Sequence, residues 1–157
     1  MHRIQCLIAA AAIAGSMTAT VAKADEAADV EAVRQANATF LGMAGTRNID
    51  AMSELWRQDD DVRAIHPFRP IDEGWDEVRA GFAALYELFP EMTVVMPEPH
   101  VQVVGDIAWV TGLEDFEGTL ADGNVVEVTL RTGRIFERDG DRWLLVHHQV
   151  SPPPNEE

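Results

Sequence analysis

The stretch that most constrains the fold is Val125–Ser151, which has the pattern of one long β-hairpin. Strand side chains alternate between the two faces of a sheet. In the first arm the even-numbered positions are mainly apolar, whereas the odd-numbered ones hold most of the charges. Asp139-Gly140-Asp141 predicts the turn, and Trp143–Val150 returns as a strand that is apolar on both faces. A strand of that kind is covered on both sides, so we expect helices over one face and another protein surface over the other.

Arg134 lies on the even-numbered, otherwise apolar stripe of the first arm. A buried guanidinium needs partners, because an unpaired charge is costly to bury. One interpretation is an internal ion pair with Glu114 or Asp115 on the neighbouring strand. The other is a site where Arg134 binds a carboxylate or another anion of a ligand bidentately. Buried charges are normally paired, which favours the ion pair.

The first 24 residues have the pattern of a secretory signal peptide. Arg3 supplies a weakly basic start, Leu7–Gly15 is an apolar run, and Ala22-Lys23-Ala24 is a cleavage site after Ala24. The run is too short to cross a membrane. Cys6 is the single cysteine and lies inside this segment, so the mature chain is expected to contain no disulfide. We expect an exported protein, in the periplasm or secreted.

The chain carries 12 basic and 27 acidic residues, a formal net charge of −15. So acidic a surface repels the phosphates of nucleic acids and anionic lipids. We therefore expect neither nucleic acid nor a membrane as a partner.

The 157 residues suit a single domain. Apolar spacing predicts a helix from about Asp29 to Gly45, a short helix capped by Asn48, and a third from Trp75 that ends before Pro90. The expected strands are Val62–His66, Met92–Met96, His100–Val104, Ile107–Glu117, Val125–Arg138 and Trp143–Val150. Helices followed by antiparallel strands predict an α+β domain over residues 25–151, with helices on one face of a curved sheet. Residues 152–157 form a tail with no reason to fold.

Three stretches together resemble the SnoaL-like domains of the nuclear transport factor 2-like superfamily. GWDEVRAGF at 74–82 resembles the start of their third helix, and PHVQVVGDIA at 99–108 resembles their first long hairpin. WLLVHHQVS at 143–151 is similar to the closing W-x-I-V-H-x-H-x-S strand, nearest in form to the association domain of calcium/calmodulin-dependent protein kinase II. The resemblance implies a cone-shaped half-barrel, with three N-terminal helices packed on a curved antiparallel sheet. It also implies a pocket between helices and sheet, and a homodimer through the sheet.

The chain departs from the association-domain pattern at several pocket positions. Gln149 replaces the second histidine of the closing motif, while Val78 and Val150 occupy a histidine and an arginine position. Arg134, by contrast, matches one of the arginine positions in the pocket of the association domain. The acidic-ligand site that the resemblance implies is therefore mostly lost.

The candidate ligand-binding residues are Arg134, His148, His147, Trp56 and His66. Adjacent strand residues point to opposite faces, so only one of the two neighbouring histidines can lie on the same face as Arg134. Even-numbered parity favours His148. A slip of one residue in the turn would place His147 on that face instead. Either histidine can act as a general acid or base near neutral pH, although a hydrogen-bonded core or interface histidine is the commoner arrangement. His66, before Pro67, is expected at the pocket mouth. Trp56 is expected in the core or the pocket wall.

Superfamily enzymes transfer protons with an Asp, a Tyr–Asp pair or a His–Asp pair in an apolar pocket, and the resemblance makes His148, Asp115 and Tyr86 the candidates for such roles. No histidine pair has metal-ligand spacing, so we expect neither a metal site nor a cofactor. Superfamily members range from isomerases, dehydratases and cyclases to non-enzymes, so the fold alone does not decide the activity.

Three hypotheses for the function follow. The first is an exported homodimer that binds a small, mostly apolar molecule, with or without a carboxylate facing Arg134. The second is a cofactor-free isomerase, dehydratase or cyclase with a His or Asp acid/base. The third is a pure dimerisation or assembly module.

Overall fold

The computed structural model describes residues 14–67 and 69–153, with side chains described from residue 26 onward. The helices are α1 (Ala14–Thr46), α2 (Ile49–Ser53) and α3 (Trp75–Leu88). The strands are β1 (Arg63–Ile65), β2 (Asp72–Glu73), β3 (Glu91–Val95), β4 (His100–Val104), β5 (Ile107–Thr119), β6 (Val125–Asp139) and β7 (Arg142–Ser151). The predicted α+β class, with its helices first, is confirmed.

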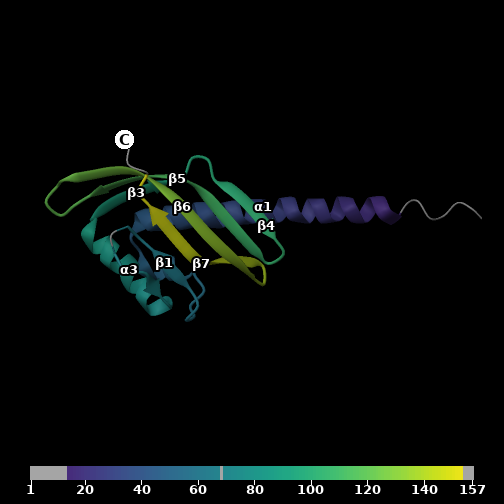
Figure 1. Cartoon of the computed structure of the whole chain (residues 1–157), viewed down its shortest axis with the longest axis horizontal. Coiled ribbons are helices and arrows are strands. Elements are labelled where there is room, and N and C mark those ends of the chain that lie inside the picture. The colour runs from purple at the N-terminus through teal and green to yellow at the C-terminus, as the bar shows by residue number, and fades with distance from the viewer. Residues whose placement is uncertain (1–13, 68, 154–157) are drawn as a thin grey trace, which may run out of the picture.

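Helix α1 begins well before the expected start near Asp29 and projects beyond the sheet (Figure 1). Alanines, the strongest helix formers, are frequent between residues 22 and 32 and continue the helix toward the N-terminus. The predicted cleavage point after Ala24 lies inside α1, while residues 1–13 of the predicted signal peptide and 154–157 of the predicted tail lie outside the described residues. Export stays a prediction. Across residues 14–67 and 69–153, no helix combines the length and apolarity that a membrane crossing requires.

The described strands form one curved, unclosed sheet in the order β2-β1-β7-β6-β5-β3. Strand β5 is long enough to pair with β4 along its first part and β3 along its last, and β6 pairs with it over its whole length. The expectation of a purely antiparallel sheet is wrong at one edge, because β1 runs parallel to β7. The two-residue strand β2, which the sequence analysis missed, then pairs antiparallel with β1.

The β6–β7 hairpin confirms that the even-numbered face of β6 is the buried one: Thr132, Arg134 and Phe136 are all buried. Its register places Arg134 opposite His148 and Ile135 opposite His147. A bulge follows, because Phe136 pairs with Leu145 and Val146 is left as the extra residue. The bulge lies between the turn and the histidines, and it fixes which histidine shares a face with Arg134.

Helices α1 and α3 cover the concave face of the sheet (Figure 1). In α3 the buried residues Val78, Phe82 and Tyr86 follow one another at four-residue spacing, as an amphipathic helix requires. The predicted cap of α2 is confirmed, since the Asn48 side chain accepts hydrogen bonds from the amides of Asp50 and Ala51 at 3.1 and 3.0 Å. Between α1, α3 and the sheet, the side chains leave a hollow.

Candidate functional site

A cavity of about 520 Å³ lies between α1, α3 and the concave face of the sheet. This volume falls within the range of small-molecule sites. Its walls are mostly apolar and include Leu85, Leu88, Phe89, Met92, Val128 and Leu130. The polar side chains that line it are His66, Arg69, Glu114, Arg134 and His148. The cavity thus has a largely apolar body and a small set of polar contacts.

Arg134 is already bound within the protein. Its Nη2 forms a short ion pair with Glu114 Oε1, and its Nη1 donates to Asn37 Oδ1 at 2.8 Å. The guanidinium carbon also lies 4.4 Å from the centre of the Phe40 ring, a cation–π distance. Burial lowers the pKa of Arg134, and the carboxylate of Glu114 opposes that effect. An arginine starts from so high a pKa that it stays protonated, so this is a true ion pair.

Glu114 completes the network by accepting a hydrogen bond from Thr132 Oγ1 at 2.9 Å. Both members of the pair are nearly fully buried, with 0% and 3% of their side chains exposed. The partner of Arg134 is therefore Glu114 and not Asp115. One donor, Arg134 Nε, is buried without a partner among the described residues.

His148 lies beside Arg134, within a cluster of rings. Its ring centre is 5.3 Å from Phe40, 5.3 Å from His66 and 6.0 Å from Phe82. Complete burial, and then the positive charge of Arg134, hold the pKa of His148 well below its usual value. The imidazole is therefore neutral at neutral pH. Its Nδ1 has no hydrogen-bond partner among the described residues.

His66 lies on the other side of His148, next to a buried carboxylate that the sequence analysis missed. His66 Nδ1 is 3.6 Å from Asp72 Oδ2, while Asp72 Oδ1 accepts a hydrogen bond from Arg69 Nη2 at 2.8 Å. Burial and the nearby Arg69 charge lower the pKa of His66 to about 4, and burial raises the pKa of Asp72. His66 is therefore neutral at neutral pH. The 3.6 Å contact with Asp72 is too long for a hydrogen bond and does not offset the burial.

Gly81 makes room for this carboxylate. A Cβ at that position would lie 2.5 Å from Asp72 Oδ2. The one sequence signal for the group is thus Gly81 itself, a glycine within the amphipathic helix α3 and within the stretch 74–82 that resembles the third helix of SnoaL-like domains. Asn37, on α1, left no signal at all.

The structure brings together three of the predicted ligand-binding residues, Arg134, His148 and His66, and separates the others from the cavity. His147 is half-buried and, paired with Ile135, lies on the convex face of the sheet. Trp56 is buried in the core, 6.2 Å from Trp75 between ring centres, and does not line the cavity. The bulge accounts for the position of His147, and the isolated bridge between Trp56 and Leu145 accounts for that of Trp56.

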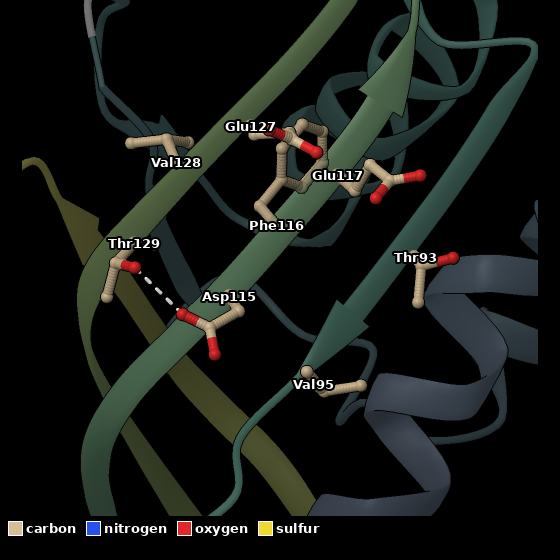
Figure 2. Close-up of a pocket in the computed structure, with 8 residues that line it drawn as sticks. All are labelled: Thr93, Val95, Asp115, Phe116, Glu117, Glu127, Val128 and Thr129. Atoms are coloured by element: carbon tan, nitrogen blue, oxygen red, sulfur yellow. Dashed lines mark hydrogen bonds between the residues drawn. The ribbon is translucent and has the colours of Figure 1, made fainter.

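Two of the three predicted acid/base candidates do not reach the cavity. Asp115 lies on the convex face, where it accepts a hydrogen bond from Thr129 Oγ1 at 2.8 Å and lines a separate groove of about 420 Å³ (Figure 2). Asp115 follows Glu114 in β5, and consecutive strand residues point to opposite faces of the sheet. Because Glu114 points into the cavity, Asp115 points away from it. Tyr86 is buried in the core, where desolvation raises its pKa to about 12. Only His148 remains of that set.

No group of three metal-ligating side chains converges anywhere in the described residues.

The comparisons with known proteins place the chain in a family. A family model described as "SnoaL-like domain" matches residues 33–155, so the chain belongs to the SnoaL-like domain family. A proposed dehydratase of the NTF2-like family from Streptomyces avermitilis is 26% identical, with a TM-score of 0.76 over 82% of this chain and 99% of that one. The resemblance noted in the closing strand is thereby confirmed.

More distant solved structures show the fold alone. An NTF2-like superfamily protein from Salmonella enterica is 18% identical, with a TM-score of 0.74 over 80% of this chain and 91% of that one. A proposed calcium/calmodulin dependent protein kinase II association domain from Xanthomonas campestris is 18% identical, with a TM-score of 0.69 over 79% and 87%. Among curated proteins, F-box protein SKIP8 of Arabidopsis thaliana is 26% identical over 124 residues, or 79% of this chain. The chain spans about half, 51%, of that relative.

The ion pair generates a stability prediction. Arg134→Met leaves Glu114 charged and buried, and should lower the free energy of unfolding by about 3–5 kcal/mol. Adding Glu114→Gln removes the orphaned charge, so the double variant should be more stable than Arg134→Met alone. Urea unfolding measures both. Arg131→Met, on the exposed face of the same strand, is the control, and a double variant no more stable than Arg134→Met would contradict the pairing.

His66 generates a pH prediction. Its pKa is about 4 in the folded chain and about 6.5 when unfolded, so between these values the unfolded chain binds the extra proton. Stability should therefore fall as the pH drops from about 6.5 to about 4, by up to a few kcal/mol from this residue. His66→Phe should show a shallower fall over that window in unfolding experiments, whereas His100→Phe removes an exposed histidine as the control. Equal slopes in wild type and His66→Phe would show that His66 titrates normally.

Proposed function

We propose that this SnoaL-like chain binds a small, mostly apolar molecule in the cavity between its helices and sheet. The observation that carries the proposal is the cavity itself, with about 520 Å³ of space, apolar walls, and His66 and His148 among its polar contacts. Convergence of a few polar groups in an apolar hollow is typical of ligand sites. A pure assembly module needs no such hollow, although its expected internal ion pair, Arg134 with Glu114, is present.

A blocking substitution tests the binding. Ala84 on α3 is exposed and lines the cavity, so Ala84→Trp should block it without disturbing the core. In a thermal-shift screen of apolar lactones, ketones and phenols, ligands that raise the melting temperature of the wild type should lose that effect in Ala84→Trp. Glu87→Trp adds the same side chain to an exposed position of α3 that does not line the cavity, and should keep the shift. Equal shifts in both variants would place the ligand elsewhere.

The neighbouring His66 and Asp72 support a second function, cofactor-free proton transfer. An imidazole that takes up a proton 3.6 Å from a carboxylate gains a stabilising partner, and His66 faces the same cavity as the proposed ligand. The S. avermitilis relative bears the name of a dehydratase, a reaction that removes a proton and a hydroxyl from its substrate. His66 would be the base, with Asp72 holding the imidazolium that forms.

Hydrogen exchange tests this activity without knowledge of the natural substrate. A ketone found in the thermal-shift screen, incubated with the protein in D₂O, should exchange the hydrogens next to its carbonyl faster than in buffer. His66→Phe should lose about a hundredfold or more of that acceleration, the usual contribution of a general base. His147→Phe, on the convex face, should retain it. Equal acceleration by wild type and His66→Phe would exclude His66 as the base.

We also propose that the chain forms a homodimer through the convex face of its sheet. That face exposes Val95, Leu113 and Ile135, which are 47, 57 and 38% exposed in the single chain, around the half-buried Trp109. Covering them with a second copy would remove apolar surface from water. Sedimentation equilibrium should give the mass of a dimer for the wild type and of a monomer for Ile135→Glu, whereas a wild-type monomer at micromolar concentration would refute the dimer.

A further inference from the structure

The charges that face the cavity are already neutralised within the protein. The cation Arg134 is paired with Glu114, and the cation Arg69 is hydrogen-bonded to Asp72 at 2.8 Å. Arg134, Glu114 and Arg69 line the cavity, and Asp72 lies next to Arg69 and His66. A ligand therefore meets no unpaired charge among the described lining residues.

The polar side chains of the cavity that lack hydrogen-bond partners are two neutral histidines. Both nitrogens of His66 and Nδ1 of His148 are buried without a hydrogen-bond partner among the described residues. Both side chains are almost withdrawn from solvent: His66 exposes 11% of its side chain and His148 is 4% exposed. A neutral imidazole offers one N–H donor and one acceptor nitrogen. An unsatisfied buried polar group costs free energy, which a ligand supplying the missing hydrogen bond would recover.

A charged ligand should bind in this cavity more weakly than a neutral one. A carboxylate would leave water for an apolar hollow, and it would reach Arg134 only by displacing Glu114, whose own charge would then be unpaired. An ammonium group meets the converse problem, because Glu114, which lines the cavity, and Asp72, which lies next to His66, already have arginine partners. The acidic-ligand alternative considered for Arg134 is thus disfavoured by the pairing.

We propose that this cavity selects uncharged ligands that carry a hydroxyl or carbonyl group, which hydrogen-bonds to His66 or His148 while an apolar body lies against the walls. The proposal rests on the binding function above and adds the chemical class of the ligand. A hydroxyl can donate to one ring and accept from the other, since the two ring centres lie only 5.3 Å apart. A carbonyl can accept from either.

A matched set of probes tests the selection. The probes are naphthalene itself and naphthalene carrying a hydroxyl, an aldehyde, a carboxylate or a methylammonium group, titrated near neutral pH against the whole chain by calorimetry. The hydroxyl and aldehyde probes should bind about tenfold more tightly than naphthalene, as a hydrogen bond between otherwise unsatisfied groups allows. The carboxylate and methylammonium probes should bind more weakly than naphthalene.

The variant Glu114→Gln tests whether the paired carboxylate is what excludes anionic ligands. It removes the negative charge that neutralises Arg134 while keeping the shape of the side chain, so binding of the carboxylate probe should improve about tenfold or more. Glu117→Gln on the same strand removes a carboxylate from the convex face and should change nothing. Binding of unsubstituted naphthalene, with the melting temperature, verifies that Glu114→Gln still folds and keeps its cavity.

The outcomes separate the two proposals. If naphthalene binds but the wild type favours the carboxylate probe, or does not distinguish the head groups, the selection is wrong and the binding function stands. If the hydroxyl and aldehyde probes keep their advantage in His66→Phe and in His148→Phe, the histidines are not the recognising groups and the selection as stated is wrong. If none of the five probes binds the wild type, the binding function itself fails.

Discussion

The buried ion pair between Arg134 and Glu114 is the interaction on which the rest of the site depends. It joins β6 to β5, and through Asn37 and Phe40 it also joins the sheet to α1. A lone arginine at this position would be a strong anion site in an apolar hollow. Paired, it becomes part of a neutral surface, and its charge adds to the burial that lowers the pKa of the adjacent His148.

A neutral polar surface changes what the cavity can do. The two histidines are kept uncharged by burial and by nearby arginines, so they act as hydrogen-bonding groups at neutral pH rather than as cations. Both have an arginine nearby, Arg69 for His66 and Arg134 for His148, but only His66 also has a carboxylate, Asp72, 3.6 Å from its ring. Proton uptake is therefore less unfavourable at His66, and the two rings are suited to different roles, base and hydrogen-bond donor.

Local sequence patterns predicted the structure best where they alone decide the conformation of the chain. Alternation along Val125–Arg138 identified the buried face, the parity argument placed His148 beside Arg134, and the closing strand indicated the family that the comparisons confirm. Such patterns predicted least where the site is assembled from distant segments. Arg69 lines the cavity from a loop, while Asn37 on a helix and Asp72 on a two-residue strand contact its lining residues, and no local pattern connects the three.

Two of the predicted acid/base residues lie outside the cavity for different physical reasons. Asp115 was considered as a pocket acid, yet its neighbour Glu114 faces inward, because consecutive strand residues point to opposite faces. Tyr86 lies on the buried side of α3 with Phe82 but does not line the cavity, whereas its neighbour Leu85 does. Spacing along a strand or helix gives the face on which a residue lies, whereas the position of a cavity along that face depends on how the elements pack.

The central claim is that the polar part of the cavity carries no net charge because His66 and His148 are neutral and both arginines are paired. Nitrogen-15 NMR of the histidine rings, followed through a pH titration, measures this directly, with His66→Phe and His148→Phe assigning the signals. The account predicts that both rings stay neutral from neutral pH down to about pH 5. A ring that becomes imidazolium between about pH 6 and 7 would contradict it, because the cavity would then present a positive charge and favour an anionic ligand.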